Sequence, residues 1–291
     1  MSRGCPSLLS KGTLASSSRG ELQKWYPLLV SGRQEEKTRE GRVRYPPVAS
    51  FHVPDGLSEI KNELPLIMKM IARTARWVHP ETFKALPIWC PDTARGFLRY
   101  DARWSRVLVN RQGVQKKEAN IRAAMALVEA LGVGTPKPKN WTVCHIWGYD
   151  DEKFAGNSNV VKDPRYYSCI GNMTWLPTPL KGFTDAVPEI KECLRVCAFH
   201  LYGWACEHDD FKIHSERIHS CEVPLGYPED WPTAERCVLP PGTAPYSERV
   251  KYSITKRKAK LQRQLADKAL EHYGHDAVRE VLAFWKVDLS D

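Results

Sequence analysis

The chain has 291 residues, of which 42% are hydrophobic and 10% aromatic, and this content excludes a wholly disordered chain. A formal net charge of +9 favours an anionic partner, either a nucleic acid, an acidic membrane face or an acidic protein. No apolar run approaches the ~20 residues of a membrane span, and the N-terminus lacks the apolar core of a secretory signal. Nine irregularly spaced cysteines are typical of reduced thiols, so we expect a cytoplasmic protein.

The first half of the chain is expected to be an arm followed by a helical region. Residues 1–56 are polar and basic, which predicts an N-terminal arm. Apolar residues recur at near-helical spacing over 57–78 and predict a helix, with Pro65 at its start or at a kink. Residues 77–104 are rich in aromatic residues and proline, which favours irregular packing with short strands. A strong helix is predicted over 117–131, ending at Gly132 and Gly134. We expect residues 57–139 to form one helical region.

The second half alternates strand-like and helical segments. Residues 141–147 (WTVCHIW) and 165–169 (RYYSC) are strand candidates, and Gly171 and Asn172 open a third element. A helix is predicted over 188–204, followed by a proline-rich loop over about 223–245. Residues 246–286 predict two helices that are separated near Gly274. The fold class expected is therefore α+β and mainly helical.

Two short segments carry the chemistry. Cys144, His145, Ile146 and Trp147 form the first, and residues 171–177 (GNMTWLP) form the second, in which Asn172 follows His145 by 27 positions. Over residues 141–186 this pattern resembles the HNH, or ββα-metal, nuclease family. In that family a His ends the first strand of a hairpin, an Asn lies where the second strand passes into a helix, and the helix carries metal ligands. The resemblance implies an HNH nuclease core over about 140–210, with surrounding helices and a C-terminal part at 211–291.

The resemblance also implies roles for individual residues. His145 would be the general base, because imidazole titrates near neutrality, and Asn172 would orient it. The offsets of the family's helix ligands fall on Lys181 and Asp185, one helical turn apart. Asp185 suits Mg²⁺ or Mn²⁺, whereas the ammonium of Lys181 has no lone pair and would contact the phosphate or replace part of the metal charge.

Several alternatives remain open for these residues. Cys144 stands where the family usually has an acidic metal ligand, so the hairpin is either short of protein ligands or a degenerate one that only binds. His145 could instead be a strand histidine satisfied inside the core. Asp150, Asp151 and Asp163 could each add a carboxylate, although solvated loop acids are the simpler interpretation.

A Cys- and His-rich stretch raises the alternative of a structural Zn²⁺ site. Its candidate ligands are Cys193, Cys197, Cys206 and His208. Because Cys193 and Cys197 lie one helical turn apart beside apolar residues, buried thiols are the competing interpretation.

Two basic runs are candidates for contact with nucleic-acid phosphates. The first runs from Arg95 to Lys117, interleaves arginines with aromatic residues and includes Arg99, Arg103 and Arg106. The second covers 249–268, with Lys256, Arg257 and Lys258 at its centre, and its alternative is a solvated helix face. If both contact DNA, the helical region at 57–139 and the C-terminal helices each bind the substrate.

A compact chain with a nuclease core and no ATPase motif fits, by analogy, a type II restriction endonuclease acting on double-stranded DNA. Cutting both strands with one site per chain favours a homodimer. A nucleic-acid-binding protein with a catalytically degenerate hairpin is the main alternative, and a homing-type or modification-dependent nuclease is a third.

Overall fold

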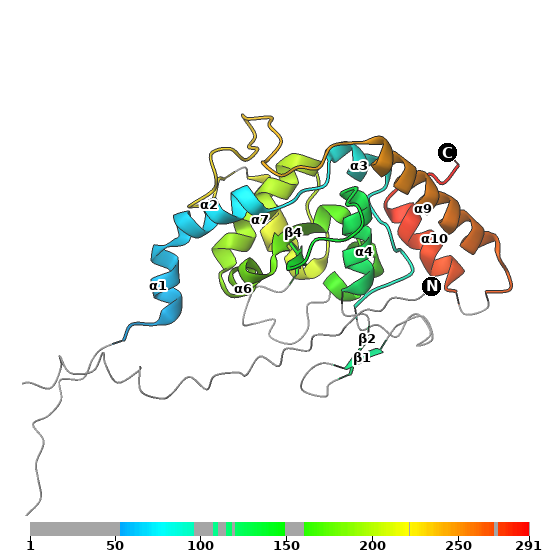
Figure 1. The fold of residues 1–291 in the computed structure, drawn as a ribbon, viewed down its shortest axis with the longest axis horizontal. Helices are drawn as coiled ribbons and strands as arrows, with labels where there is room; N and C mark the ends of the chain where they lie inside the picture. Colours follow the sequence, from blue (N-terminus) through cyan, green and yellow to red (C-terminus); the bar gives the residue numbers. More distant parts are fainter. Residues whose placement is uncertain are drawn as a thin grey trace, which may run out of the picture. The chain divides into compact units, whose positions relative to one another are not determined.

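The computed structural model describes residues 53–95, 107–109, 115–117, 120–148, 160–220, 222–270 and 273–290. Residues 54–291 form one compact unit. Its helices surround a short two-stranded hairpin near the centre of the view (Figure 1). The described part is mainly helical with small antiparallel sheets, which confirms the α+β class. No helix among the described residues is both long and apolar enough to cross a membrane.

The N-terminal helices follow the predicted apolar spacing but are divided. Helix α1 spans Gly56–Asn62 and α2 spans Leu64–Thr74, so the single helix expected over 57–78 is two helices. The division lies at Glu63 because Pro65 occupies the first turn of α2, where its missing N–H costs nothing. Helix α2 buries Leu64, Ile67, Met68, Ile71 and Ala72, and the short α3 (Pro80–Ala85) follows it.

Among the described residues, four strands form two separate antiparallel pairs. Strand β1 (Val107–Val109) pairs with β2 (Gln115–Lys117), and α4 (Ile121–Ala130) follows and ends before Gly132. Strand β3 (Trp141–His145) pairs with β4 (Met173–Pro177), which places His145 opposite Met173.

The strand expected at 165–169 is wrong. Residues Pro164–Tyr167 form α5, a single helical turn, between the 3₁₀ turns η4 (Val160–Lys162) and η5 (Ile170–Asn172). The helix begins there because the Asp163 side chain accepts a hydrogen bond from the backbone N–H of Arg165, and Pro164 stands at the first helical position.

The C-terminal half is helical, as predicted. The 3₁₀ turn η6 (Thr178–Leu180) leads into α6 (Lys181–Ala186) and then α7 (Pro188–Tyr202), which ends at Gly203 with a φ of 64°. After the 3₁₀ turn η7 (Asp209–Phe211) come α8 (Lys212–His219), an irregular loop over 222–247, and the predicted pair α9 (Glu248–Ala266) and α10 (His275–Phe284).

The β3–β4 hairpin lies between two hydrophobic clusters. Cys144, Ile146 and Leu176 belong to a cluster that includes residues of α2 and α7. Val143, Met173 and Trp175 belong to a second cluster with residues of α4, α9 and α10. This division follows from the strand period of two, which sends successive side chains to opposite faces. Each cluster includes residues from all three ranges expected as separate regions, 57–139, 140–210 and 211–291.

Candidate functional site

His145 lies at the end of β3 with its side chain almost completely covered, at 6% relative exposure. Its Nε2 is 2.9 Å from the carbonyl oxygen of Tyr167, and the two rings stack with centroids 5.6 Å apart. A carbonyl oxygen only accepts, so Nε2 must carry the proton and Nδ1 holds the lone pair of the neutral ring. Within the described part of the chain, no residue hydrogen-bonds to Nδ1. Nδ1 is therefore the atom that could accept a proton.

The surroundings of His145 keep its imidazole neutral. Burial is the main cause that lowers the pKa of His145 to about 3, with smaller contributions from the positive charges of Arg95, Lys191 and Lys181, and the Tyr167 hydrogen bond acts in the opposite direction. Arg95 is the first residue of the first basic run, and one of its terminal nitrogens donates to Asn120 Oδ1 at 2.7 Å. Three cations therefore act on a histidine that is a free base at neutral pH, an environment that suits an anionic substrate.

Asn172 is fully buried and joins the two segments that meet at His145. Its Oδ1 accepts from the backbone N–H of Trp147 at 2.7 Å, and its Nδ2 donates to the carbonyl oxygen of Tyr166 at 3.1 Å. Its own carbonyl accepts from Ile146 N–H at 2.8 Å. The one-turn α5 makes this arrangement available, because a helix leaves its last carbonyls without partners inside the helix. Asn172 thus fixes both the residues after His145 and those before Tyr167.

The position of Asn172 in the hairpin differs from the expectation. It precedes β4 and does not stand where the second strand passes into the helix, because the strand that pairs with β3 is 173–177 and residues 165–167 are helical. The glycine before it is constrained by packing: a Cβ at Gly171 would lie 2.7 Å from a ring carbon of Phe83. Phe83 is itself packed among Tyr202, Trp204 and Trp285, so there is little room for a larger residue at 171.

A buried lysine that the sequence analysis did not single out also contacts this site. Lys191 on α7 is 2% exposed, and its Nζ donates to the carbonyl oxygen of His145 at 2.6 Å. The sequence does carry a signal for this lysine. Lys191 and Arg195 lie four residues apart beside the apolar Ile190 and Leu194, which places both charged residues on the buried face of α7. Charged residues are rarely fully buried without partners, so such a pair indicates specific contacts.

Helix α6 packs against the opposite face of the hairpin from the His145 ring. The thiol of Cys144 contacts Thr184 Oγ1 at 3.3 Å, which places α6 on the Cys144 face. His145 shares the other face with Met173, its cross-strand partner. Lys181 Nζ lies 2.6 and 2.5 Å from the two carboxylate oxygens of Asp185, so these residues form an ion pair with each other. The structure thus brings Cys144 to α6 and His145 to α5.

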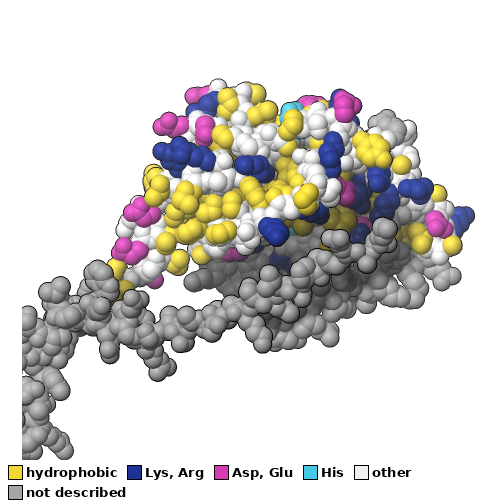
Figure 2. All heavy atoms as spheres, viewed as in Figure 1, with side chains coloured by type: hydrophobic (Ala, Val, Ile, Leu, Met, Phe, Trp, Pro, Cys, Tyr) yellow, Lys and Arg dark blue, Asp and Glu magenta, His cyan; other side chains and the backbone are white. Residues whose placement is uncertain are grey.

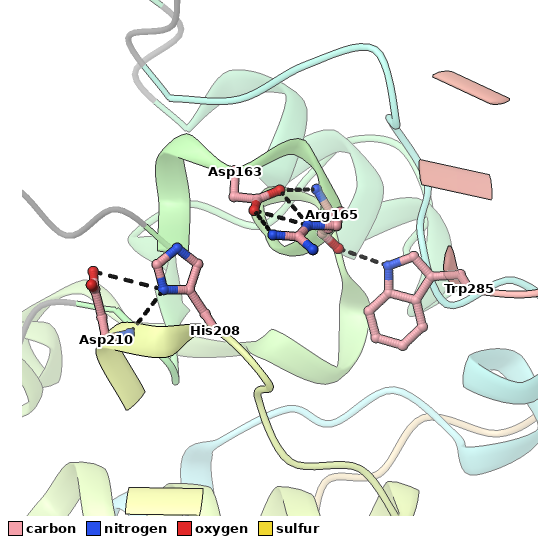
Figure 3. Close-up of polar contacts among 5 residues, drawn as sticks. All are labelled: Asp163, Arg165, His208, Asp210 and Trp285. Atoms are coloured by element: carbon pink, nitrogen blue, oxygen red, sulfur yellow. Dashed lines mark hydrogen bonds and ion pairs between the residues drawn. The ribbon is translucent and has the colours of Figure 1, made fainter. Parts of the chain in front are cut away.

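The donor set does not fit the expected Mg²⁺ or Mn²⁺ site. Asp185 is held by Lys181, and Cys144 contacts a threonine. Asp163 binds Arg165 through hydrogen bonds of 2.6 to 3.2 Å, as Figure 3 shows. Among the described residues, no three His, Cys, Asp or Glu side chains are close enough together to hold a metal ion. Asp150 and Asp151 lie outside the described residues.

The candidate zinc ligands have other environments in the structure. Cys193, Cys197 and Cys206 are buried free thiols. Burial raises the pKa of Cys193 and that of Cys206 to about 12, and that of Cys197 well above its usual value, so all three stay protonated. His208 Nδ1 accepts from the backbone N–H of Asp210 at 3.1 Å (Figure 3). These contacts support the interpretation of buried thiols.

The predicted phosphate contacts divide into three groups. Arg99, Arg103 and Arg106 lie outside the described residues. Lys256 is exposed. Arg257 and Lys258, predicted as phosphate contacts with a solvated helix face as the alternative, are only 8% and 7% exposed. The physical reason is packing of α9 on α4, where Arg257 Nη2 binds Glu129 Oε2 at 2.6 Å.

Comparison of the chain with protein families, with curated proteins and with solved structures finds no match.

Proposed function

We propose that this protein is a DNA endonuclease of the HNH type, which hydrolyses phosphodiester bonds with His145 as the general base. The observation that carries the proposal is the state of the His145 ring: it is neutral, its Nε2–H is fixed on the Tyr167 carbonyl, and Nδ1 is left to accept a proton. The order β3, β4 and then α6 also agrees with a strand–strand–helix core. We further propose double-stranded DNA as the substrate, in the manner of a homodimeric, site-specific restriction enzyme.

The chemistry requires one proton transfer and compensation of phosphate charge. Nδ1 of His145 takes a proton from a water whose oxygen attacks phosphorus, and the P–O bond to the leaving oxygen breaks while that oxygen takes a proton from solvent. The extra negative charge in the transition state needs nearby positive charge. Arg95, Lys181 and Lys191 are the cations whose charge reaches His145. Lys191 holds the carbonyl of His145 and Asn172 holds the N–H of Trp147, two residues later, which keeps the ring aimed.

A nucleic-acid-binding protein with a degenerate hairpin is the second candidate. Two observations favour it: His145 is 6% exposed, as a core histidine would be, and Asp185 is paired with Lys181. Both candidates bind nucleic acid, so the test that separates them is whether the protein cuts DNA.

Supercoiled plasmid incubated with the wild-type protein and with His145→Ala, in Mg²⁺, Mn²⁺ or EDTA, tests the proposal. Discrete fragments from the wild type alone would support a site-specific endonuclease, and a smear would support a non-specific one. A plasmid that is shifted on a gel but never cut would favour the binding protein. Equal cutting by His145→Ala would reject His145 as the base.

A further inference from the structure

A basic groove runs between α4 and α9, about 560 Å³ in volume. We call it the α9 groove. Helix α9 lines one side with Tyr252 and five cations, of which Arg257 pairs with Glu129 and the other four are the groove cations Arg249, Lys256, Lys260 and Arg263. Helix α4 contributes Glu129 to the other side. Figure 2 shows dark-blue side chains gathered over α9 at the right of the view.

The positive charge of the α9 groove is largely uncompensated. Glu129 is neutralised by Arg257 at 2.6 Å. Within the described part of the chain, Lys256 and Lys260 have no ion-pair partner, and Arg249 and Arg263 reach only backbone carbonyls, those of Val133 and Ala259. A solvated helix face commonly pairs its own charges, as Lys251 and Glu248 do at 2.7 Å on the same helix. The four groove cations differ from that pattern.

The four cations form a single row. Their spacings of seven, four and three residues, at 3.6 residues per turn, confine them to an arc of about 60° around the helix. The row extends over fourteen residue steps, which is about 21 Å at the helical rise. The packing side of α9 is different, because Val250, Ile254, Arg257 and Leu261 are buried. A straight row of this length, whose cations have no ion-pair partner among the described residues, matches a linear polyanion better than an isolated carboxylate or a small ligand.

We propose that the α9 groove binds the sugar–phosphate backbone of duplex DNA and holds the substrate while the hairpin acts on it. Tyr252, which is 68% exposed beside the cations, adds a phenol O–H that can donate to a phosphate oxygen. This inference rests on the DNA substrate of the proposed function, and it assigns binding to residues remote in sequence from His145. Contacts of this kind position the substrate without reading its bases, so affinity should depend on salt and not on sequence.

The test compares two triple variants in a His145→Ala background. Lys256→Gln, Lys260→Gln and Arg263→Gln remove the groove charges. Lys69→Gln, Arg73→Gln and Lys212→Gln remove exposed cations elsewhere, and in either triple three lost charges take the net charge from +9 to +6. Binding of a labelled duplex is measured in EDTA by fluorescence anisotropy over a salt series, after circular dichroism has shown both variants folded. Affinity falls as salt rises, so the slope of log affinity against log salt is negative. The groove triple should make this slope shallower by about three units, and the control triple by less than one.

The outcomes separate this inference from the catalytic proposal, because binding is measured without turnover. Equal slopes in the two triples would overturn the α9 groove as a DNA site, even if the wild type cuts plasmid. Tighter binding of single-stranded RNA or of an acidic polypeptide than of duplex DNA would overturn it as well. A loss of duplex binding in the groove triple but not in the control triple supports the α9 groove as a DNA site. That result would hold even if the wild-type protein cuts no DNA.

Discussion

The side-chain oxygen of Asn172 accepts a 2.7 Å hydrogen bond from the backbone N–H of Trp147, two residues beyond His145. The nitrogen of the same amide donates to the carbonyl of Tyr166, next to the residue that binds the His145 ring. One buried side chain therefore sets the distance between the histidine and its partner. Rigid support of this kind is what a positioned general base needs.

Replacing Asn172 by Ala should weaken both the fold and the site. It leaves the N–H of Trp147 without its partner, at a cost of about 1–3 kcal/mol, and removes one donor from the carbonyl of Tyr166, which keeps the N–H of Cys169 at 3.3 Å. Thermal unfolding measures the loss, with Asn62→Ala on exposed α1 as the control. Cleavage per folded molecule should also drop. If the folded fraction of Asn172→Ala cuts at the wild-type rate, Asn172 is a structural residue only.

Replacing His145 by Ala should abolish cleavage and leave DNA binding intact. Loss of a general base typically reduces the rate ~10²–10⁴-fold, whereas binding depends on many cations. Plasmid cleavage and duplex binding are to be measured on the same preparation. Wild-type cleavage by this variant would reject the site, and a parallel loss of binding would mean that His145 supports the fold of the DNA-binding surface.

The low pKa of His145 predicts a specific loss of stability in acid. The pKa is about 3 in the folded chain and near 6.5 in the unfolded one. Below pH 6.5 the unfolded state therefore binds the proton more strongly, so stability is fully present above pH 6.5 and declines as pH falls toward 3. Between pH 7 and pH 4, wild type should lose about 3 kcal/mol more unfolding free energy than His145→Gln, as measured by urea denaturation. Parallel pH profiles would contradict a buried neutral histidine.

Local patterns predicted much of this fold. The helix predicted over 188–204 is α7, which ends at Gly203, the pair predicted on either side of Gly274 is α9 and α10, and β3 follows from its alternating, β-branched and aromatic sequence. The aromatic residues at 165–169 resembled a strand, but the cap formed by Asp163 and Pro164 decided the local structure. This signal was present in the sequence and outweighs β-propensity, which depends on context.

The site was harder to predict, because its contacts join distant segments. Arg257 looked like a surface cation, and its burial depends on Glu129, which lies 128 positions earlier. Lys191 contacts His145 across 46 positions. The sequence could predict that Cys144 and His145 point to opposite faces of the hairpin, since neighbouring side chains on a strand alternate. It could not predict which of the two faces α6 covers, because that depends on tertiary packing.

The ion pair between Lys181 and Asp185 gives the sharpest test of what supplies charge to the phosphate. If Asp185 binds a divalent ion, Asp185→Asn should raise the metal concentration needed for half-maximal cleavage. If Asp185 instead competes with the phosphate for Lys181, the same change frees the ammonium, and cleavage should be unchanged or faster at every metal concentration. The pair is partly exposed, with side chains at 29% and 49%, so its loss should change stability by no more than about 1 kcal/mol.

Lys181 itself is then tested by removing and by keeping its charge. Lys181→Ala should lower the rate at every metal concentration, because added metal does not replace a charge that belongs to the protein. Lys181→Arg should retain most of the rate, since the positive charge persists. Lys84→Ala removes the lysine of another short helical ion pair, with Glu81 at 2.7 Å, and should leave cleavage unchanged.

If Lys181→Ala cuts like wild type, Lys181 is a surface lysine and the charge comes from elsewhere. Cleavage that persists in excess EDTA and is lost in Lys181→Ala would make Lys181 the electrostatic catalyst. Cleavage abolished by EDTA would require a metal ion, and ligands beyond Asp185 to hold it.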